Sequence, residues 1–169
     1  MRIHVGWMRG LGILFAVSSL VACAAGTPGM KPNVDVAAEK TRVKSVVDQF
    51  TQVWETKDME LFSRIMAHDA DMVVYGSDAP EHWVGWEPLK QAVQKMLPSY
   101  ERAKITVKEQ SFKIHPAGDV AWFSQVWDWD MVMDGKPVRS DGQRLTGILE
   151  KRNGSWVIVQ IHNSVPVAG

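Results

Sequence analysis

Residues 144–164 read RLTGILEKRNGSWVIVQIHNS, a pattern of two β-strands joined by a turn. Asn-Gly within the turn permits a two-residue loop, whereas a three-residue loop over residues 152–154 shifts the pairing of the strands by one position. Because successive residues of a strand point to opposite faces, this shift decides which side chains are buried together. The three-residue loop is favoured, since it gathers one wholly apolar face made of Leu145, Gly147, Leu149, Val157, Val159 and Ile161.

The same pairing gathers polar side chains on the opposite face of this hairpin. That face carries Arg144, Thr146, Glu150, Gln160 and His162, together with Trp156 and Ile158. A histidine on such a mixed face is typical of an interface or of solvent exposure, so we do not expect His162 to act as a base. Asn163 has the opposite parity and is predicted to point inward.

Upstream of this hairpin, the sequence predicts three helices. Apolar residues recur at helical spacing over residues 36–54, 61–66 and 89–97, with charged residues on the opposite side of the first helix. Asp58 is placed to cap the second helix.

The remaining segments read as strands. A short β run covers residues 71–76, and residues 104–114 change parity, which predicts a β-bulge between Glu109 and Ser111. A long aromatic strand follows over residues 119–135. Three helices before four long strands predict an α+β fold: a cone in which three N-terminal helices pack on a strongly bent, mostly antiparallel sheet, with a pocket at its open end.

The first residues have the pattern of a secretory signal peptide. A basic region with Arg2 and Arg9 precedes the apolar run of residues 11–22, which is short for a transmembrane helix. Residues 20–23, LVAC, resemble the lipobox of bacterial lipoproteins. That resemblance implies cleavage before Cys23, lipidation of this cysteine and, with alanine following it, a position at the periplasmic face of the outer membrane. Ordinary signal-peptidase cleavage after an A-x-A-like site is the alternative.

The chain is therefore predicted to have one folded domain. We assign residues 1–22 to the signal peptide, residues 23–34 to the lipidated cysteine and a flexible tether rich in small residues, and residues 35–166 to the domain. Basic and acidic residues balance at 19 each, so we expect no binding to nucleic acid.

Several motifs resemble those of SnoaL-like proteins in the nuclear transport factor 2-like (NTF2-like) superfamily. The resemblance covers nearly the whole predicted domain and includes RLT (144–146), KRNGSW (151–156), HNS (162–164), QFTQVWETKD (49–58), WVGW (83–86) and GDVAW (118–122). It implies the cone-shaped fold of that superfamily. It does not imply one function, because this superfold hosts isomerases, dehydratases, cyclases, hydrolases and binding modules.

Within that superfamily, the pattern is similar to the association domain of calcium/calmodulin-dependent protein kinase II, a dimer-based hub that is not an enzyme. Its pocket is known for arginines that bind small carboxylates, and the matching positions here hold Trp127, Gly147 and Asn163. The resemblance therefore does not imply an anion-binding site in this chain, and we expect an aromatic pocket in its place.

Strand parity and the resemblance together define a predicted ligand pocket. Alternation along residues 122–131 turns Phe123, Gln125, Trp127 and Trp129 inward, and it turns Trp122 and the aspartates outward. Three tryptophans are expected to converge near the mouth of the cone, as ligand-stacking groups do. The predicted pocket residues are Trp54, Phe62, Tyr75, Trp86, Phe123, Gln125, Trp127 and Asn163.

No catalytic centre can be assigned from the sequence. Tyr75 is the best inward proton-bearing side chain, but a phenol is a poor general base at neutral pH, so we expect it to hydrogen-bond with Gln125 and Asn163. The histidines are scattered over separate elements, and we expect no metal and no cofactor. The sequence favours a domain that binds a small, largely apolar or aromatic ligand. An isomerase or dehydratase acting on a small hydrophobic substrate, and a dimeric assembly module, are the alternatives.

A homodimer is the expected assembly. The outer face of the predicted sheet carries Trp122, Arg144, Trp156 and His162. Such a face is too apolar for solvent and too polar for a core, which is typical of an interface between two copies.

Overall fold

The computed structural model describes residues 34–166. The predicted signal peptide, Cys23 and residues 24–33 of the predicted tether lie outside the described residues. In the described part the elements are, in chain order, α1 (Val36–Thr56), α2 (Met59–Ile65), β1 (Val73–Tyr75), β2 (His82–Val84), α3 (Trp86–Met96), the 3₁₀ turn η1 (Leu97–Ser99), β3 (Arg102–Ile114), β4 (Val120–Met133), β5 (Lys136–Arg152) and β6 (Ser155–Ser164). None of these helices is long and apolar enough to cross a membrane.

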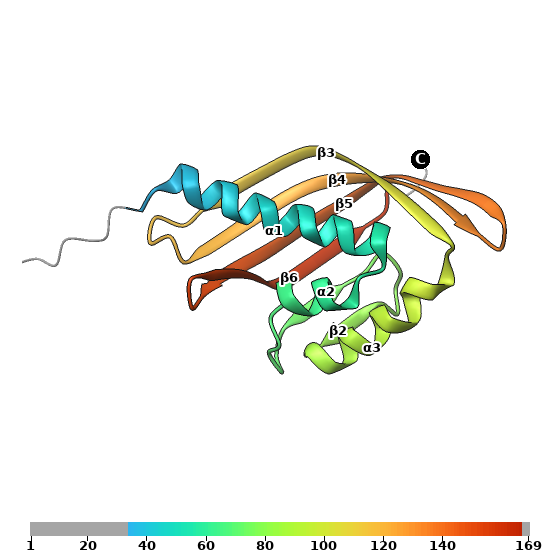
Figure 1. Ribbon diagram of the computed structural model, residues 1–169, viewed down its shortest axis with the longest axis horizontal. Coiled ribbons are helices and arrows are strands. Elements are labelled where there is room, and N and C mark those ends of the chain that lie inside the picture. The colour runs from blue at the N-terminus through green and yellow to red at the C-terminus, as the bar shows by residue number, and fades with distance from the viewer. Residues whose placement is uncertain (1–33, 167–169) are drawn as a thin grey trace, which may run out of the picture. The chain divides into compact units, whose positions relative to one another are not determined.

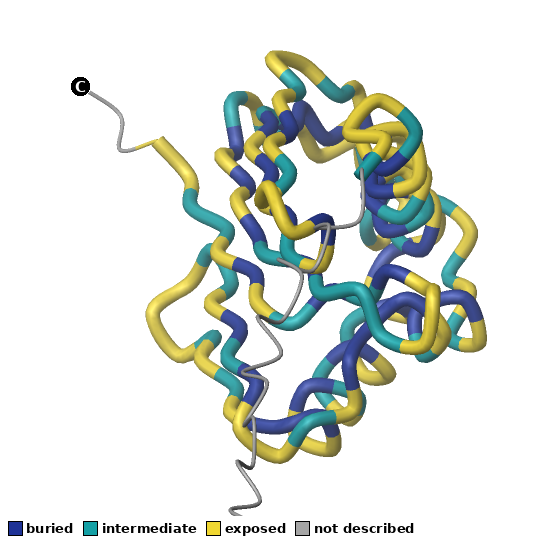
Figure 2. Tube along the Cα trace, turned by 90° about the vertical axis from the view of Figure 1, so that its left-hand side faces the viewer, coloured by how far each residue is buried: buried dark blue, intermediate teal, exposed yellow. Residues whose placement is uncertain are grey.

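All the described strands belong to one sheet, in the order β2-β1-β6-β5-β4-β3. Only β1 and β6 pair in parallel. The long strands curve, and α1 lies along one face of them (Figure 1). Buried and exposed positions alternate along the strands, so one face of the sheet meets the helices while the other meets solvent (Figure 2). The predicted α+β fold with an open, curved, mostly antiparallel sheet is confirmed.

The first two helices begin at side-chain caps. Asp35 accepts a hydrogen bond from the backbone N–H of Ala38 at 3.0 Å, and Asp58 accepts one from Leu61 at 2.8 Å, which confirms the predicted cap of α2. The predicted apolar stripe of α1 is buried against the sheet, with Val43, Val47, Phe50 and Val53 between 0% and 4% exposed. The caps set where α1 and α2 begin, and the stripe sets which side of α1 faces the sheet.

The turn between β5 and β6 differs from the prediction. It is a two-residue turn over Asn153 and Gly154, whose φ angles are 51° and 84°, and it pairs Arg152 with Ser155. The predicted three-residue loop is therefore wrong. A β-bulge at Val159 then shifts the register, so that Gly147 pairs with Ile161 and Leu145 pairs with Asn163. The bulge allows both halves of the hairpin to turn apolar residues inward.

This bulge divides β6 into a half predicted correctly and a half predicted wrongly. Beyond it, Ile161 is buried and His162 is exposed, as expected. Before it, Trp156 and Ile158 are 5% and 0% exposed and face the helices, although the sequence placed them on the outer face. Trp156 therefore cannot contribute to a dimer surface. The outer face keeps Trp122, which is 43% exposed, and the homodimer stays a prediction.

The central strands follow the predicted alternation. The bulge in β3 lies between Lys108 and Ser111, as expected. Asp128 faces away from the helices but is only 4% exposed, because a second bulge brings the backbone N–H of Gly142 within 3.0 Å of it and Lys108 covers it. The hydrogen bond from Lys108, followed by that from Gly142, holds the pKa of Asp128 below its usual value. The prediction of a solvent-facing carboxylate is corrected to a buried, paired one.

Candidate functional site: an aromatic pocket between helices and sheet

A cavity of about 230 Å³ lies between the inner face of the sheet and the helices. Its walls come from all three α-helices of the described chain and from β1, β2, β4, β5 and β6, so the pocket forms only when the helices and the sheet have packed together. Eight aromatic side chains line it: Phe50, Trp54, Phe62, Tyr75, Trp83, Tyr100, Trp127 and Trp129. The flexible side chains of Met66, Met96, Met131 and Met133 complete the apolar wall.

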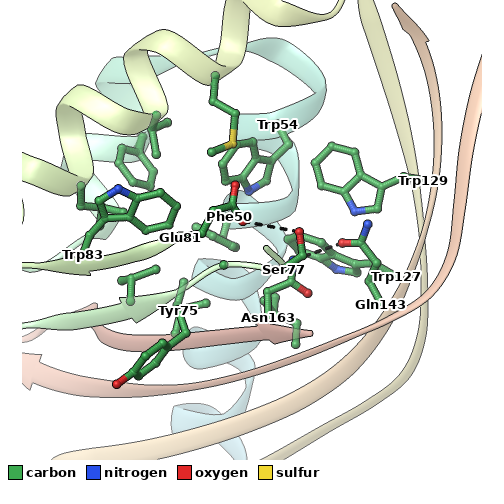
Figure 3. A pocket seen from close by; sticks show the side chains of 18 of the residues that line it. Phe50, Trp54, Tyr75, Ser77, Glu81, Trp83, Trp127, Trp129, Gln143 and Asn163 are labelled. Atoms are coloured by element: carbon green, nitrogen blue, oxygen red, sulfur yellow. Dashed lines mark hydrogen bonds between the residues drawn. The ribbon is translucent and has the colours of Figure 1, made fainter. Parts of the chain in front are cut away.

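Four of these aromatic rings form one continuous cluster. Phe50 stacks on Trp127 with ring centroids 5.8 Å apart, and it meets Trp54 edge to face at 5.9 Å. Trp129 meets Trp54 at 5.9 Å and Trp127 at 5.7 Å, with angles between the ring planes of 63° and 64°. Steeply tilted rings present both faces and edges to the cavity (Figure 3). The cluster therefore offers stacking surfaces in more than one direction.

Polar atoms gather where β4, β5 and β6 meet the cavity. Asn163 donates from Nδ2 to Oε1 of Gln143 at 3.1 Å (Figure 3). Gln143 in turn donates to Ser140 at 2.9 Å. In residues 34–166, five buried side-chain polar atoms have no hydrogen-bond partner in the protein, and four of them belong to pocket residues: Nε1 of Trp54, Trp127 and Trp129, and Oδ1 of Asn163. Unpaired buried polar atoms are uncommon in folded proteins, so their concentration here favours a polar partner brought by a ligand.

Tyr100 fixes the position of the first tryptophan. It is 5% exposed, and its hydroxyl donates to the backbone carbonyl of Trp54 at 2.5 Å. Burial raises the pKa of Tyr100 to about 12, so the phenol keeps its proton at neutral pH. Tyr100 is thus a positioning group in the pocket wall.

Among the described residues one carboxylate lines the pocket, Glu81, and it was not predicted from the sequence. Glu81 lies at the end of a turn in which the N–H of Gly76 donates to its carbonyl at 2.7 Å and its own N–H donates to the carbonyl of Asp78 at 2.9 Å. Its Oε2 accepts from the N–H of Asp78 at 3.1 Å and from Ser77 at 3.5 Å. Glu81 shares its parity with the pocket residue Trp83, and this was the signal that could have indicated it.

Five of the eight predicted pocket residues line the cavity. They are Trp54, Phe62, Trp127 and Asn163 in its wall and Tyr75 at its rim. Gly147, a further position that the resemblance to the association domain indicated, does not reach the cavity. A Cβ there would lie 2.5 Å from the Phe123 ring and 2.7 Å from the backbone oxygen of Gln160.

Tyr75 reaches only the rim, and its predicted inward orientation is wrong. It is 44% exposed and stacks on His82 at 4.6 Å, with ring planes 7° apart. In the sheet it pairs with His162, so both side chains lie on the outer face. Its hydroxyl points away from the cavity in Figure 3. No hydrogen bond joins Tyr75 to Gln125 or to Asn163 among the described residues.

The other three predicted residues point inward but are core residues. Trp86 stacks on Phe62 at 5.5 Å and on His68 at 4.2 Å at the start of α3. Phe123 packs against Phe112, and Gln125 accepts a hydrogen bond from Gln110 at 2.8 Å. Phe123 and Gln125 face the interior, as strand alternation predicted. All three residues nevertheless lie outside the lining of the cavity.

Comparison with known proteins adds a family and several fold neighbours. The SnoaL-like domain family matches residues 43–168. An NTF2-like superfamily protein from Salmonella enterica serovar Typhimurium superimposes with a TM-score of 0.69 at 15% identity, over 78% of this chain and 94% of that one. A Xanthomonas campestris protein named for the calcium/calmodulin-dependent protein kinase II association domain gives 0.64 at 20% identity, over 75% and 87%. A Novosphingobium aromaticivorans protein named for scytalone dehydratase gives 0.68 at 8% identity, over 78% and 86%. No curated protein sequence matches this chain.

Proposed function

The chain belongs to the SnoaL-like domain family, a small-molecule-binding branch of the NTF2-like fold, and we propose that it binds a small, largely apolar or aromatic molecule without catalysing a reaction on it. The observation that carries this proposal is the wall of eight aromatic side chains around a cavity of about 230 Å³. An engineered cavity of about 150 Å³ is enough to hold benzene, so the size fits a ligand of one ring with substituents.

The buried polar atoms without a partner support a ligand that carries at least one polar group. Trp127 and Trp129 would donate to an acceptor atom, and Asn163 Oδ1 would accept from a donor. Small carboxylates are disfavoured, because no Lys, Arg or His lines the cavity in the described part of the chain and Glu81 does. This pocket therefore carries a negative charge and no positive one, unlike the anion-binding site that the resemblance to the association domain implies.

The proposal is tested by titrating the protein with neutral monocyclic aromatics and with benzoate, followed by tryptophan emission and calorimetry. We expect saturable binding of the neutral compounds and none of benzoate. Trp127→Phe should keep the fold and weaken aromatic ligands by about threefold to tenfold, since it loses the larger ring face and the indole N–H. Tight benzoate binding with no response to neutral aromatics would refute the proposal, and Trp122→Phe on the outer face is the matched control.

A proton-transferring enzyme is the second candidate, and Glu81 is the observation that favours it. Dehydratases and isomerases need a base inside the pocket, and Glu81 is the one carboxylate in its described lining. One neighbour of this fold is named for a dehydratase. Turnover of a bound compound that is lost in Glu81→Gln while binding persists would favour this second function over simple binding.

We further propose that the domain is anchored to the cell envelope through Cys23, as the LVAC motif implies. Lipidation at a lipobox cysteine adds several acyl chains, which suffice for stable membrane attachment where a single chain does not. Cys23→Ser is expected to move the protein from the membrane fraction to the soluble fraction of its host. An unchanged membrane fraction in this variant would show that lipidation is not the anchor, and Ala25→Ser provides the control.

A further inference from the structure

The carboxylates that are buried or partly buried divide into two groups. Six are not exposed in residues 34–166: Glu39, Glu55, Asp69, Glu81, Asp128 and Glu150. Five of the six form an ion pair with a lysine or arginine: Glu39 with Lys151, Glu55 with Lys104, Asp69 and Glu150 with Arg152, and Asp128 with Lys108. Glu81 is the sixth, and no basic residue of the described chain lies within 4.0 Å of it. Of these six carboxylates, the one without a cation is thus the one in the pocket.

The protein compensates this charge only in part. The Glu81 carboxylate accepts two hydrogen bonds, one from the N–H of Asp78 and one from the hydroxyl of Ser77. Both go to Oε2. No donor of the described residues bonds to Oε1, and this atom is not among the fully buried ones, so it stays accessible to a ligand that enters the pocket. Removing a carboxylate from water is unfavourable unless a counter-charge or hydrogen bonds replace the solvent. A positive group beside Oε1 would supply the missing counter-charge.

The rings around Glu81 favour the same kind of ligand. Glu81 lines the same pocket as Trp54, Trp83 and Trp129 (Figure 3), and Trp54 meets Trp129 at an angle of 63°. Aromatic faces carry negative potential and attract cations, most strongly when the site is shielded from water. The unpaired indole N–H groups of the pocket bear no net charge, so they can take an acceptor elsewhere on the ligand without opposing a cation.

We propose that the ligand of this pocket is an organic cation, with an ammonium group held by Glu81 and the tryptophan faces and an apolar body in the cavity. This inference rests on the proposed binding function and specifies its ligand class. A lysine-like or inorganic cation would leave the apolar wall unused, whereas an anion would meet Glu81 without any basic partner. The chemistry of the site thus selects an amine or quaternary ammonium attached to a ring or a short hydrocarbon.

The test compares three probes of similar size: phenyltrimethylammonium, its neutral isostere tert-butylbenzene, and benzoate. Calorimetry on the purified domain is expected to show that the ammonium binds about tenfold or more tightly than the isostere, with no detectable binding of benzoate. Glu81→Gln should reduce this preference to about threefold or less. Glu87→Gln, which removes the same charge from an exposed position in α3, should leave it unchanged.

Each outcome separates this inference from the proposed function. Equal binding of the ammonium and the isostere by the unmodified protein would overturn the cation assignment while the binding function stands. Binding of neither would contradict both. A preference that persists in Glu81→Gln would also overturn the role of this carboxylate. Near-ultraviolet circular dichroism checks that both variants are folded, and the probe comparison on the unmodified protein decides the matter even where a variant is unstable.

Discussion

Gly147→Ala is expected to lower the free energy of unfolding by about 3 kcal/mol, the upper end of the usual range for overpacking. The added Cβ would lie 2.5 Å from Cε1 of Phe123 and 2.7 Å from the backbone oxygen of Gln160. The ring could turn aside, but the carbonyl belongs to β6, which pairs with β5 at this point. Relief therefore requires the two strands to separate, and chemical denaturation measures the cost.

A neighbouring substitution distinguishes this steric effect from a general weakening of β5. Thr146→Ala changes an exposed residue of the same strand and adds no atom to the interior, so it should cost less than about 1 kcal/mol. If Gly147→Ala were as stable as the unmodified protein, the close approach of β5 and β6 at this position would be refuted. The same crowding leaves no space at position 147 for any longer side chain.

The parts of the fold that the sequence predicted well depend on local patterns. The stripe of α1, the Asp58 cap and the alternation along β4 each follow from residues within one or two turns or along a single strand. The register of the last hairpin does not. Residues 156–159 are all apolar, so alternation cannot say which of them face inward, and the bulge at Val159 depends on packing against the helices. The Asn-Gly pair indicated the two-residue turn, whereas the burial of a single apolar face favoured the longer loop, and the bulge satisfies both the turn and the burial.

The candidate site likewise contains residues that local patterns predict correctly and residues that they do not. Trp127 and Asn163 were found because parity fixes their face once their strands are aligned. Tyr75 was placed wrongly, because the parity of β1 is set by its parallel pairing with β6, which lies 87 positions further along at His162. Glu81 was missed because its place in the pocket depends on the closure of the turn that begins at Gly76. Contacts distant in sequence thus decide which inward residues reach the cavity.

Glu39→Gln is expected to lower the free energy of unfolding by about 3 kcal/mol at neutral pH, the lower end of the range for breaking a buried ion pair. Glu39 is 5% exposed, and it joins α1 to the last hairpin. Lys151 donates to Oε1 at 2.8 Å, and the indole N–H of Trp156 donates to Oε2 at 2.8 Å. The neutral amide leaves Lys151 without its counter-charge in a partly buried position, which destabilises the contact between α1 and the sheet.

The effect should depend on pH in a defined direction. The hydrogen bond from Lys151 lowers the pKa of Glu39 from 4.5, with further lowering from Trp156 and Arg42, while burial opposes them. A carboxyl whose pKa is lower in the folded than in the unfolded state stabilises the fold fully above the unfolded value of 4.5, and this contribution is lost as the pH falls through the lower folded value. Denaturation at a series of pH values should therefore show the unmodified protein and Glu39→Gln converging below pH 4.5, while the exposed control Glu60→Gln stays close to the unmodified protein throughout. A difference that is independent of pH would mean that Glu39 stabilises α1 by packing and not by its charge.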